Sequence, residues 1–279
     1  NGVLYYSING GSSWQQVGIV SSSNALLLSS DSNTRLYFQP TTLNFNGSIS
    51  DVLTFRAWDQ TNTTSNSNQA GSYAALDAGG GTSAYSTASD TVSISVIPVN
   101  DAPTLTGAAS TLAYTEQAAL SAIDTNITVG DVDNPTSFNS GYLKASFTAN
   151  GTTSDQLVVI NSGTGAGQIS VSGSNVSYAG TLIGTIDNTY NGVNGADLKI
   201  SLNSSATIAA TQALARNIGF QNNSNAPSTS ARTVTFTLDD GGNIGGGALQ
   251  ATRTATINVT AVNDAPTLTG AASTLAYTE

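Results

Sequence analysis

Apolar and polar residues alternate along much of the chain. Val92, Ile94 and Val96 are separated by serines, and the same period of two runs through Leu53–Ala57 and Val234–Leu238. A period of two places alternate side chains on one face of a strand, so these segments are predicted to be strands with one buried face. Many short strands separated by turns favour an all-β sandwich.

Two local features refine this pattern. The segment Tyr5–Trp14 predicts a hairpin that turns at Asn9-Gly10, because Asn and Gly tolerate a positive φ. The segment Thr207–Ile218 departs from the β pattern, since it is rich in Ala and places Ile208 and Leu214 at roughly helical spacing. It predicts one short helix in the second domain, packed across one end of the sandwich.

An internal repeat divides the chain. The 17 residues Asn100–Glu116 recur without a change at Asn263–Glu279, an offset of 163 residues. The β-patterned stretches that precede the two copies, residues 91–99 and 254–262, also correspond. We therefore expect residues 1–99 to be the C-terminal part of one sandwich repeat, residues 100–262 a complete repeat, and residues 263–279 the opening strand of the next. The parent protein is expected to be longer.

Composition argues against several kinds of function. The chain has 7 Lys and Arg against 17 Asp and Glu, a formal net charge of −10, and no Cys, Met or His. Without Cys or His it lacks thiol nucleophiles and the commonest general base, so we expect no enzyme. The acidic balance does not suit nucleic acid, and no apolar stretch is long enough for membrane insertion. An acidic chain rich in oxygen ligands suits a hard cation such as calcium.

At its junctions the sequence resembles a known family. The segment Val99-Asn-Asp-Ala-Pro103, repeated at Val262-Asn-Asp-Ala-Pro266, is similar to the linker that ends cadherin-like domains in giant bacterial adhesins, including the repeats-in-toxin adhesins. The further matches are Phe45-Asn-Gly47, the stretch Leu53–Asp59, the Asp131-x-Asp133 element and Thr115-Glu116. The resemblance implies tandem cadherin-like or immunoglobulin-like β-sandwich repeats, calcium (Ca²⁺) between neighbouring repeats of the same chain, and an extracellular place on the bacterial cell surface.

The acidic residues themselves support a calcium site at the first junction. Five of them fall in one window, namely Asp101, Glu116, Asp124, Asp131 and Asp133. They would repel one another unless a cation or solvent separated them. Asn100 offers a side-chain carbonyl, and Asp59 at the end of a strand in the first domain is expected to reach from the other side.

The second junction has its own candidate ligands. They are Asp239, Asp240, Asn263, Asp264 and Glu279, and we expect this set to be incomplete because no Asp-x-Asp element follows it. At both junctions the other interpretation is that these acids are solvated residues that form turns.

Three functions of different classes remain open. The first is a structural spacer that holds an adhesion domain away from the cell surface. The second is a subunit of an extracellular filament, in which identical molecules join head to tail because residues 263–279 are a spare opening strand. The third is a module for surface glycans, which would need exposed aromatic residues such as Trp58 with Tyr5 or Tyr6; the competing interpretation is a partly buried Trp58. Asp239 and Asp240 do not form a glycosidase pair on a strand, because neighbouring residues there face opposite ways.

Overall fold

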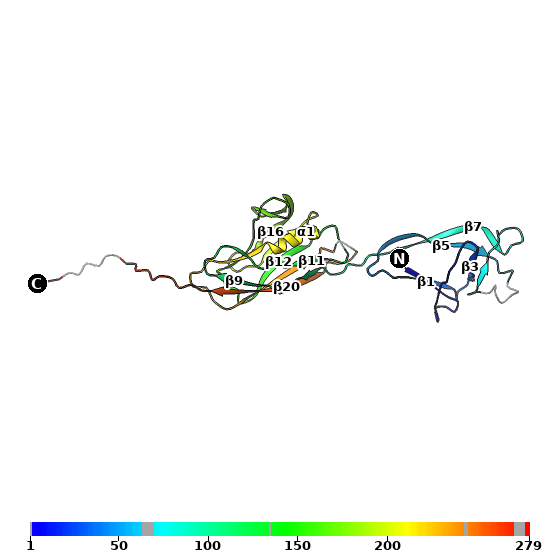
Figure 1. The fold of residues 1–279 in the computed structure, drawn as a ribbon, viewed down its shortest axis with the longest axis horizontal. Coiled ribbons are helices and arrows are strands. Elements are labelled where there is room, and N and C mark those ends of the chain that lie inside the picture. The colour runs from blue at the N-terminus through cyan, green and yellow to red at the C-terminus, as the bar shows by residue number, and fades with distance from the viewer. Residues whose placement is uncertain (1, 63–69, 134, 243–244, 271–276) are drawn as a thin grey trace. The chain divides into compact units, whose positions relative to one another are not determined.

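The chain folds into two compact units, residues 1–98 and 99–279. The structure is a computed structural model that describes residues 2–62, 70–133, 135–242, 245–270 and 277–279. Nearly all of its regular structure is β (Figure 1), which confirms the predicted all-β sandwich class. The division between the units lies directly before Val99, at the start of the first junction segment.

The described part of the first unit contains three small sheets. Its strands are β1 (Gly2–Ser7), β2 (Gln15–Gln16), β3 (Asn24–Leu26), β4 (Arg35–Pro40), β5 (Gly47–Trp58), β6 (Tyr73–Ala75) and β7 (Tyr85–Val96). They pair in the orders β2-β1-β4, β3-β6 and β5-β7. The predicted hairpin is present as β1 and β2, and its turn contains Gly10 at a φ of 72°. The buried core of this unit is small, with Leu27, Ala74 and Tyr85 at its centre.

The second unit is a two-layered sandwich. One layer is an eight-stranded sheet in the order β14-β15-β16-β17-β12-β19-β20-β9, and the facing strands form the smaller sheets β10-β18-β13 and β11-β8. The strands are β8 (Thr104–Thr106), β9 (Thr111–Thr115), β10 (Ser121–Ala122), β11 (Thr128–Gly130), β12 (Tyr142–Ala149), β13 (Asp155–Val159), β14 (Ile169–Ser172), β15 (Asn175–Tyr178), β16 (Thr181–Asn191), β17 (Leu198–Leu202), β18 (Ile218–Asn222), β19 (Arg232–Asp239) and β20 (Gln250–Thr260). One continuous core of buried apolar side chains fills the space between the layers.

The predicted helix is present as α1 (Ile208–Arg216), which contacts β11 of the small sheet and β15 of the large one. Thr207 begins it, because its side-chain oxygen accepts a hydrogen bond from the Ala210 amide at 3.2 Å. Leu214 is buried in the common core. On the polar side, the Val129 amide of β11 donates to Gln212 Oε1 at 3.1 Å. The helix therefore continues the short β8-β11 sheet as a cover for the core.

The hairpin that ends the first unit is repeated in the second unit with the same register. In the first unit the pairs are Leu53↔Val92, Thr54↔Thr91 and Phe55↔Asp90; in the second they are Val234↔Ala255, Thr235↔Thr254 and Phe236↔Arg253. Each β20 residue in this set stands 163 positions after its β7 counterpart, which is the offset of the sequence repeat. The hairpin is therefore repeated in the structure as well as in the sequence.

The two hairpins differ in how well their inner faces are covered. Phe236 is fully buried against the second layer of its sandwich, whereas its counterpart Phe55 is 47% exposed. Val92 is likewise exposed, although its counterpart Ala255 is buried. In the part of the first unit that the structure describes, β7 pairs with β5 alone, while β20 has both β19 and β9 as neighbours.

A buried ion pair lies in the second unit. Arg232 Nε approaches Asp155 Oδ2 at 3.2 Å, and neither side chain is exposed to solvent. Asp155 also accepts hydrogen bonds from Asn222 Nδ2 at 2.6 Å and from the Thr152 amide at 2.7 Å. These partners satisfy the carboxylate, so the pair is stable as long as both charges are present.

Removing the cation from this pair should destabilise the second unit strongly. Arg232→Met leaves Asp155 charged and buried, which is expected to cost about 3–5 kcal/mol. The matched control is Lys144→Met, because Lys144 pairs with Asp197 at 3.5 Å with both side chains about one-third exposed, and such a pair contributes at most about 1 kcal/mol. Urea unfolding followed by far-UV circular dichroism measures the loss.

Tryptophan fluorescence provides an internal reference for this experiment. Both tryptophans, Trp14 and Trp58, are in the first unit. Their unfolding transition should not move in either variant. Equal effects of Arg232→Met and Lys144→Met on the second unit would contradict a dominant role of the buried pair.

Candidate functional site

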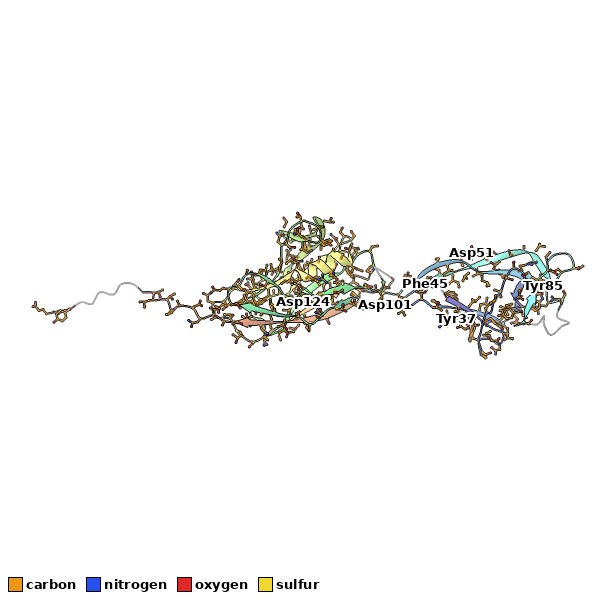
Figure 2. All side chains as sticks on the ribbon, viewed as in Figure 1. Tyr37, Phe45, Asp51, Tyr85, Asp101 and Asp124 are labelled. Carbon is orange, nitrogen blue, oxygen red and sulfur yellow. The ribbon has the colours of Figure 1, made fainter. Side chains whose placement is uncertain are left out.

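Four carboxylates gather at the end of the second unit where its chain begins. Asn100 and Asp101 precede β8, Asp131 and Asp133 follow β11, and Asp240 follows β19. Strands β8 and β11 are antiparallel, and Thr104 pairs with Gly130, so the start of one strand meets the end of the other. We call Asn100, Asp101, Asp131, Asp133 and Asp240 the acidic cluster; Figure 2 labels Asp101 within it.

Short hydrogen bonds link the members of the acidic cluster. Asn100 Nδ2 donates to Asp240 Oδ2 at 2.8 Å, and the neighbouring Asp101 amide donates to Asp133 Oδ2 at 2.6 Å. The Asp133 amide in turn donates to Asp131 Oδ1 at 2.9 Å. The junction segment is thus attached on one side to Asp240 and on the other side to the Asp131-x-Asp133 turn.

The surroundings of Asp131 disfavour the charged form of its carboxyl group. Burial raises the pKa of Asp131, and the charges of Asp133, Asp240 and Asp101 raise it further, while the hydrogen bond from the Asp133 amide partly opposes them. Carboxylates from three segments of the chain therefore act on one another.

The sequence predicted that Asp239 and Asp240 belong to the second junction. The structure places them at the opposite end of the second unit. They follow β19, and Asp239 pairs with Gln250 at the start of β20, whereas the second junction follows Thr260 at its end. The 11 residues of β20 separate these positions, by about 33 Å at the usual rise of a strand. The expected grouping with Asn263 and Asp264 was wrong because the two strands are antiparallel.

Glu116 lies at that second end and is not part of the acidic cluster. Its backbone amide donates to Thr260 O at 2.9 Å, and its Oε2 accepts from the Val262 amide at 2.8 Å. The side chain is buried, and its other oxygen, Oε1, has no hydrogen-bond partner among the described residues. Asn263 and Asp264 follow directly and are exposed, so the second junction offers one buried carboxylate oxygen and several exposed ones.

Asp124, which falls in the same sequence window, forms a structural ion pair. Its Oδ2 accepts a hydrogen bond from Arg253 Nε at 2.8 Å, and the carboxylate is almost fully buried. Arg253 also donates to the Gly107 carbonyl at 3.0 Å. The ion pair joins the loop between β10 and β11 to β20, and it accounts for the Asp124 charge without a metal ion.

Asp59 belongs to the first unit and stabilises its own turn. Its carboxylate accepts hydrogen bonds from the Thr61 amide at 2.9 Å and the Thr61 hydroxyl at 2.7 Å, and these bonds lower its pKa. It follows β5, at the end of the hairpin opposite to Gly47 and Val96. By the shared register, Asp59 is four residues after Phe55 as Asp240 is four residues after Phe236, so the two acids are counterparts.

The oxygen ligands of the acidic cluster are of the kind that calcium prefers, although its carboxylates do not point to one common position. All of its side-chain ligands would be oxygen atoms, which calcium prefers. No group of three or more acidic, His or Cys side chains among the described residues is already arranged to hold a metal ion. An ion at this end would therefore draw the side chains together from their present hydrogen bonds.

Exposed aromatic residues group on the first unit, but they do not include Trp58. Trp58 packs on the small core, and its Nε1 donates to Asn62 Oδ1 at 2.8 Å, which agrees with the partly buried interpretation. Tyr5, Trp14 and Tyr37 instead line an open hollow with Gln39, and the rings of Trp14 and Tyr37 lie 5.8 Å apart. Tyr37 is labelled in Figure 2. Tyr37 was not among the aromatic residues predicted for this role, because no local pattern links it to the β1 hairpin; β4 brings it beside Tyr5.

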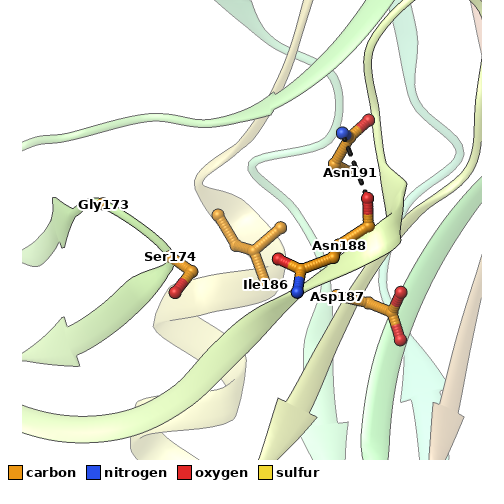
Figure 3. A pocket seen from close by; sticks show the side chains of 6 residues that line it. All are labelled: Gly173, Ser174, Ile186, Asp187, Asn188 and Asn191. Carbon is orange, nitrogen blue, oxygen red and sulfur yellow. Dashed lines mark hydrogen bonds between the residues drawn. The ribbon is translucent and has the colours of Figure 1, made fainter.

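A second hollow lies in the second unit, where the pairing of β16 with β17 is interrupted. Figure 3 shows Asp187, Asn188 and Asn191 around it. Asp187 Oδ1 accepts hydrogen bonds from the amides of Thr189 and Tyr190 at 2.8 and 3.1 Å, and these bonds lower its pKa. The side chains here shape a turn and bring no second titratable group to the hollow.

Comparisons with known proteins add no assignment. No protein-family model matches the chain, and neither does any curated protein. In the described residues no helix has the length and apolar character needed to cross a membrane.

The raised pKa of Asp131 predicts an unusual stabilising substitution. An acid whose pKa is raised in the folded state favours folding at low pH, and this contribution is lost as the pH rises through the folded pKa. Asp131→Asn removes the charge and keeps a carbonyl for the Asp133 amide. In chelator at pH 7 the variant should therefore unfold at a higher urea concentration than the original chain, and the difference should disappear near pH 3.

Asp187→Asn is the matched control with the opposite sign. Its pKa is lowered by amide hydrogen bonds, so the charged form favours folding at neutral pH. This variant should be less stable than the original chain at pH 7 and equal to it near pH 3. A loss of stability at pH 7 in both variants would contradict the repulsion within the acidic cluster.

Proposed function

We propose that this chain acts as structural spacer repeats of a secreted bacterial surface protein, stiffened by calcium at the junctions of its repeats. The observation that carries the proposal is the shared register of β5-β7 and β19-β20, each of which is followed by a Val-Asn-Asp-Ala-Pro segment. Units that end in the same hairpin and continue through the same junction suit an extended tandem array. This role needs no catalytic residue and agrees with the cadherin-like resemblance of the junctions.

Calcium would act on the ends of each repeat. At one end of the second unit the candidate ligands are Asn100, Asp101, Asp131, Asp133 and Asp240. At the other end they are Glu116, whose buried Oε1 has no hydrogen-bond partner in the part of the chain that the structure describes, and Asn263 and Asp264. A bound ion would neutralise repulsion and fix the junction segment by bonds to several parts of the chain. Affinities of about 10⁻⁴–10⁻³ M are usual for extracellular calcium modules and would suffice outside the cell.

Calorimetry in chelator and in millimolar calcium tests this function. The melting temperature of the second unit should rise with calcium, because an ion that binds only the folded state stabilises it by about 2.7 kcal/mol at 100 times its dissociation constant. Asp131→Asn should lose most of the rise although it melts above the original chain in chelator. A variant that is more stable than the original chain in chelator but gains less stability from calcium distinguishes ion binding from a general salt effect.

Two controls accompany the calorimetry. Asp187→Asn should keep the full calcium shift, because Asp187 lies outside the acidic cluster, and magnesium at equal concentration should shift the melting temperature less than calcium does. The same melting temperature in chelator and in calcium would leave a spacer without metal and remove the calcium part of the proposal.

A second candidate function, binding of surface glycans, is favoured by the aromatic hollow on the first unit. Tyr5 and Tyr37 are direct neighbours across β1 and β4, and Trp14 meets Tyr37 edge to face. Exposed rings of this kind can stack on sugar rings, and Gln39 offers an amide for hydroxyl groups.

Glycan-array binding of two tryptophan variants tests the second candidate. Trp14→Ala should abolish binding, since it removes an exposed ring of the hollow. Trp58→Phe, which changes the partly buried tryptophan, should retain it. Binding that survives Trp14→Ala, or no binding by the original chain, would end this candidate.

A further inference from the structure

The last strand of the second unit runs parallel to a strand near its beginning. β9 and β20 are joined by five residue pairs, which we call the β9–β20 ladder. Two backbone bonds extend it, from the Thr256 amide to Ser110 O at 3.1 Å and from the Glu116 amide to Thr260 O at 2.9 Å. Because the strands are parallel, the chain enters β9 at one end of the ladder and leaves β20 at the other end.

This direction of pairing determines how the ladder carries tension. In the proposed spacer the chain is pulled through the first junction, before Asn100, and through the second junction, after Val262. Tension then draws β9 backward and β20 forward along their own axes, so the evenly spaced bonds between them are loaded together, in shear. Strands pulled apart from one shared end would instead lose these bonds one pair at a time.

Further contacts hold the ladder at both of its ends. Beyond β20, the Val262 amide donates to the buried carboxylate of Glu116 at 2.8 Å. Before β9, the Gly107 carbonyl accepts a hydrogen bond from Arg253 of β20 at 3.0 Å. Arg253 is itself fixed, because its Nε pairs with the buried Asp124 at 2.8 Å. Both segments that connect the ladder to the junctions are therefore attached to the partner strand.

Sliding of β9 along β20 would also draw a large side chain out of the core. Tyr114 of β9 is 2% exposed, and its ring lies edge to face on Phe220 with centroids 4.9 Å apart. Its hydroxyl donates to Ala118 O at 2.6 Å and accepts from the Asn222 amide at 3.2 Å. Since side chains alternate between the two faces of a strand, a slip of one residue would turn Tyr114 away from the core. These contacts hold the ladder in one register.

We propose that the β9–β20 ladder is the force-bearing element of the second unit, a clamp that lets the repeat carry tension along the chain without unfolding. The proposal rests on the spacer function, because it requires that tension enters through the two junctions. It does not require calcium, since all of these contacts join groups of the protein. Resistance to force is governed by the rate of unfolding and is distinct from equilibrium stability.

Force spectroscopy of the full chain in two pulling directions tests the clamp. The chain has no Cys, so a pair of introduced thiols defines where the force acts. Val99→Cys with Ala265→Cys loads the ladder in shear, whereas Ala118→Cys with Ala265→Cys pulls on the end that β9 and β20 share; all three positions are exposed. In chelator the unfolding force should be several-fold larger in the first direction. Unfolding there should release about 500 Å of chain in one step.

Two proline variants in the shear direction test the hydrogen bonds of the ladder. The Glu116 amide faces β20, and the amides of successive residues face opposite edges of a strand, so the Leu112 amide faces β20 and the Ala113 amide faces away. A proline is tolerated where the amide of an edge strand faces away from its neighbour. Leu112→Pro should therefore lower the unfolding force several-fold, and Ala113→Pro should leave it nearly unchanged. Far-UV circular dichroism checks the folding of both variants, and the comparison of directions uses exposed substitutions alone.

A core variant separates the clamp from global stability. Leu157→Ala removes a buried side chain of β13, which pairs with β18 in the facing layer. It should lower the urea midpoint of the second unit but keep most of the force in the shear direction, because its contacts remain intact when the ladder breaks.

Three results would overturn the proposal. They are equal unfolding forces in the two directions, equal forces for Leu112→Pro and Ala113→Pro, and a force in Leu157→Ala that falls in step with its urea midpoint. Each is measured in chelator and leaves the calcium shift of the melting temperature untouched, so failure of the clamp is distinguishable from failure of the calcium-stiffened spacer.

Discussion

The pairing of the last strand of a repeat with both of its neighbours is the interaction on which the second unit depends. β20 is bonded to β19 on one side and to β9 on the other, and this brings the opening residues of the repeat alongside its final strand. Because β9 supplies Tyr114 to the core, the same pairing closes the sandwich over Phe220. The first unit has the same final hairpin without such a third strand among its described residues, and there Phe55 stays half-exposed where Phe236 is buried. The second layer that covers the final hairpin of the second unit therefore separates a well-filled sandwich from the small core of the first unit.

The carboxylates of the second unit have two kinds of surroundings. Asp155 and Asp124 are buried, and each has an arginine partner, so their charges are balanced within the fold. The acidic cluster at the start of the unit receives an amide from Asn100, and the pKa of Asp131 within it is raised by burial and raised further by the charges of Asp133, Asp240 and Asp101. A chain with 7 basic residues against 17 acidic ones cannot pair every carboxylate internally. Asp101, Asp131 and Asp133 lie at one end of the repeat and Asp264 follows its other end, where an external cation has access.

The sequence predicted the elements better than their arrangement. Alternation at Val92–Val96 and the Ala-rich run at α1 are local signals, and both elements formed where expected because short-range spacing determines which face is buried. The positions of Asp240 and Glu116 depend on which strands are antiparallel and on where each strand ends, and no local pattern contains that information. Asp124 was grouped with the calcium candidates because it is near them in sequence, yet its partner Arg253 is 129 residues away. The aromatic hollow was missed for the same reason, since Tyr37 joins Tyr5 through long-range pairing.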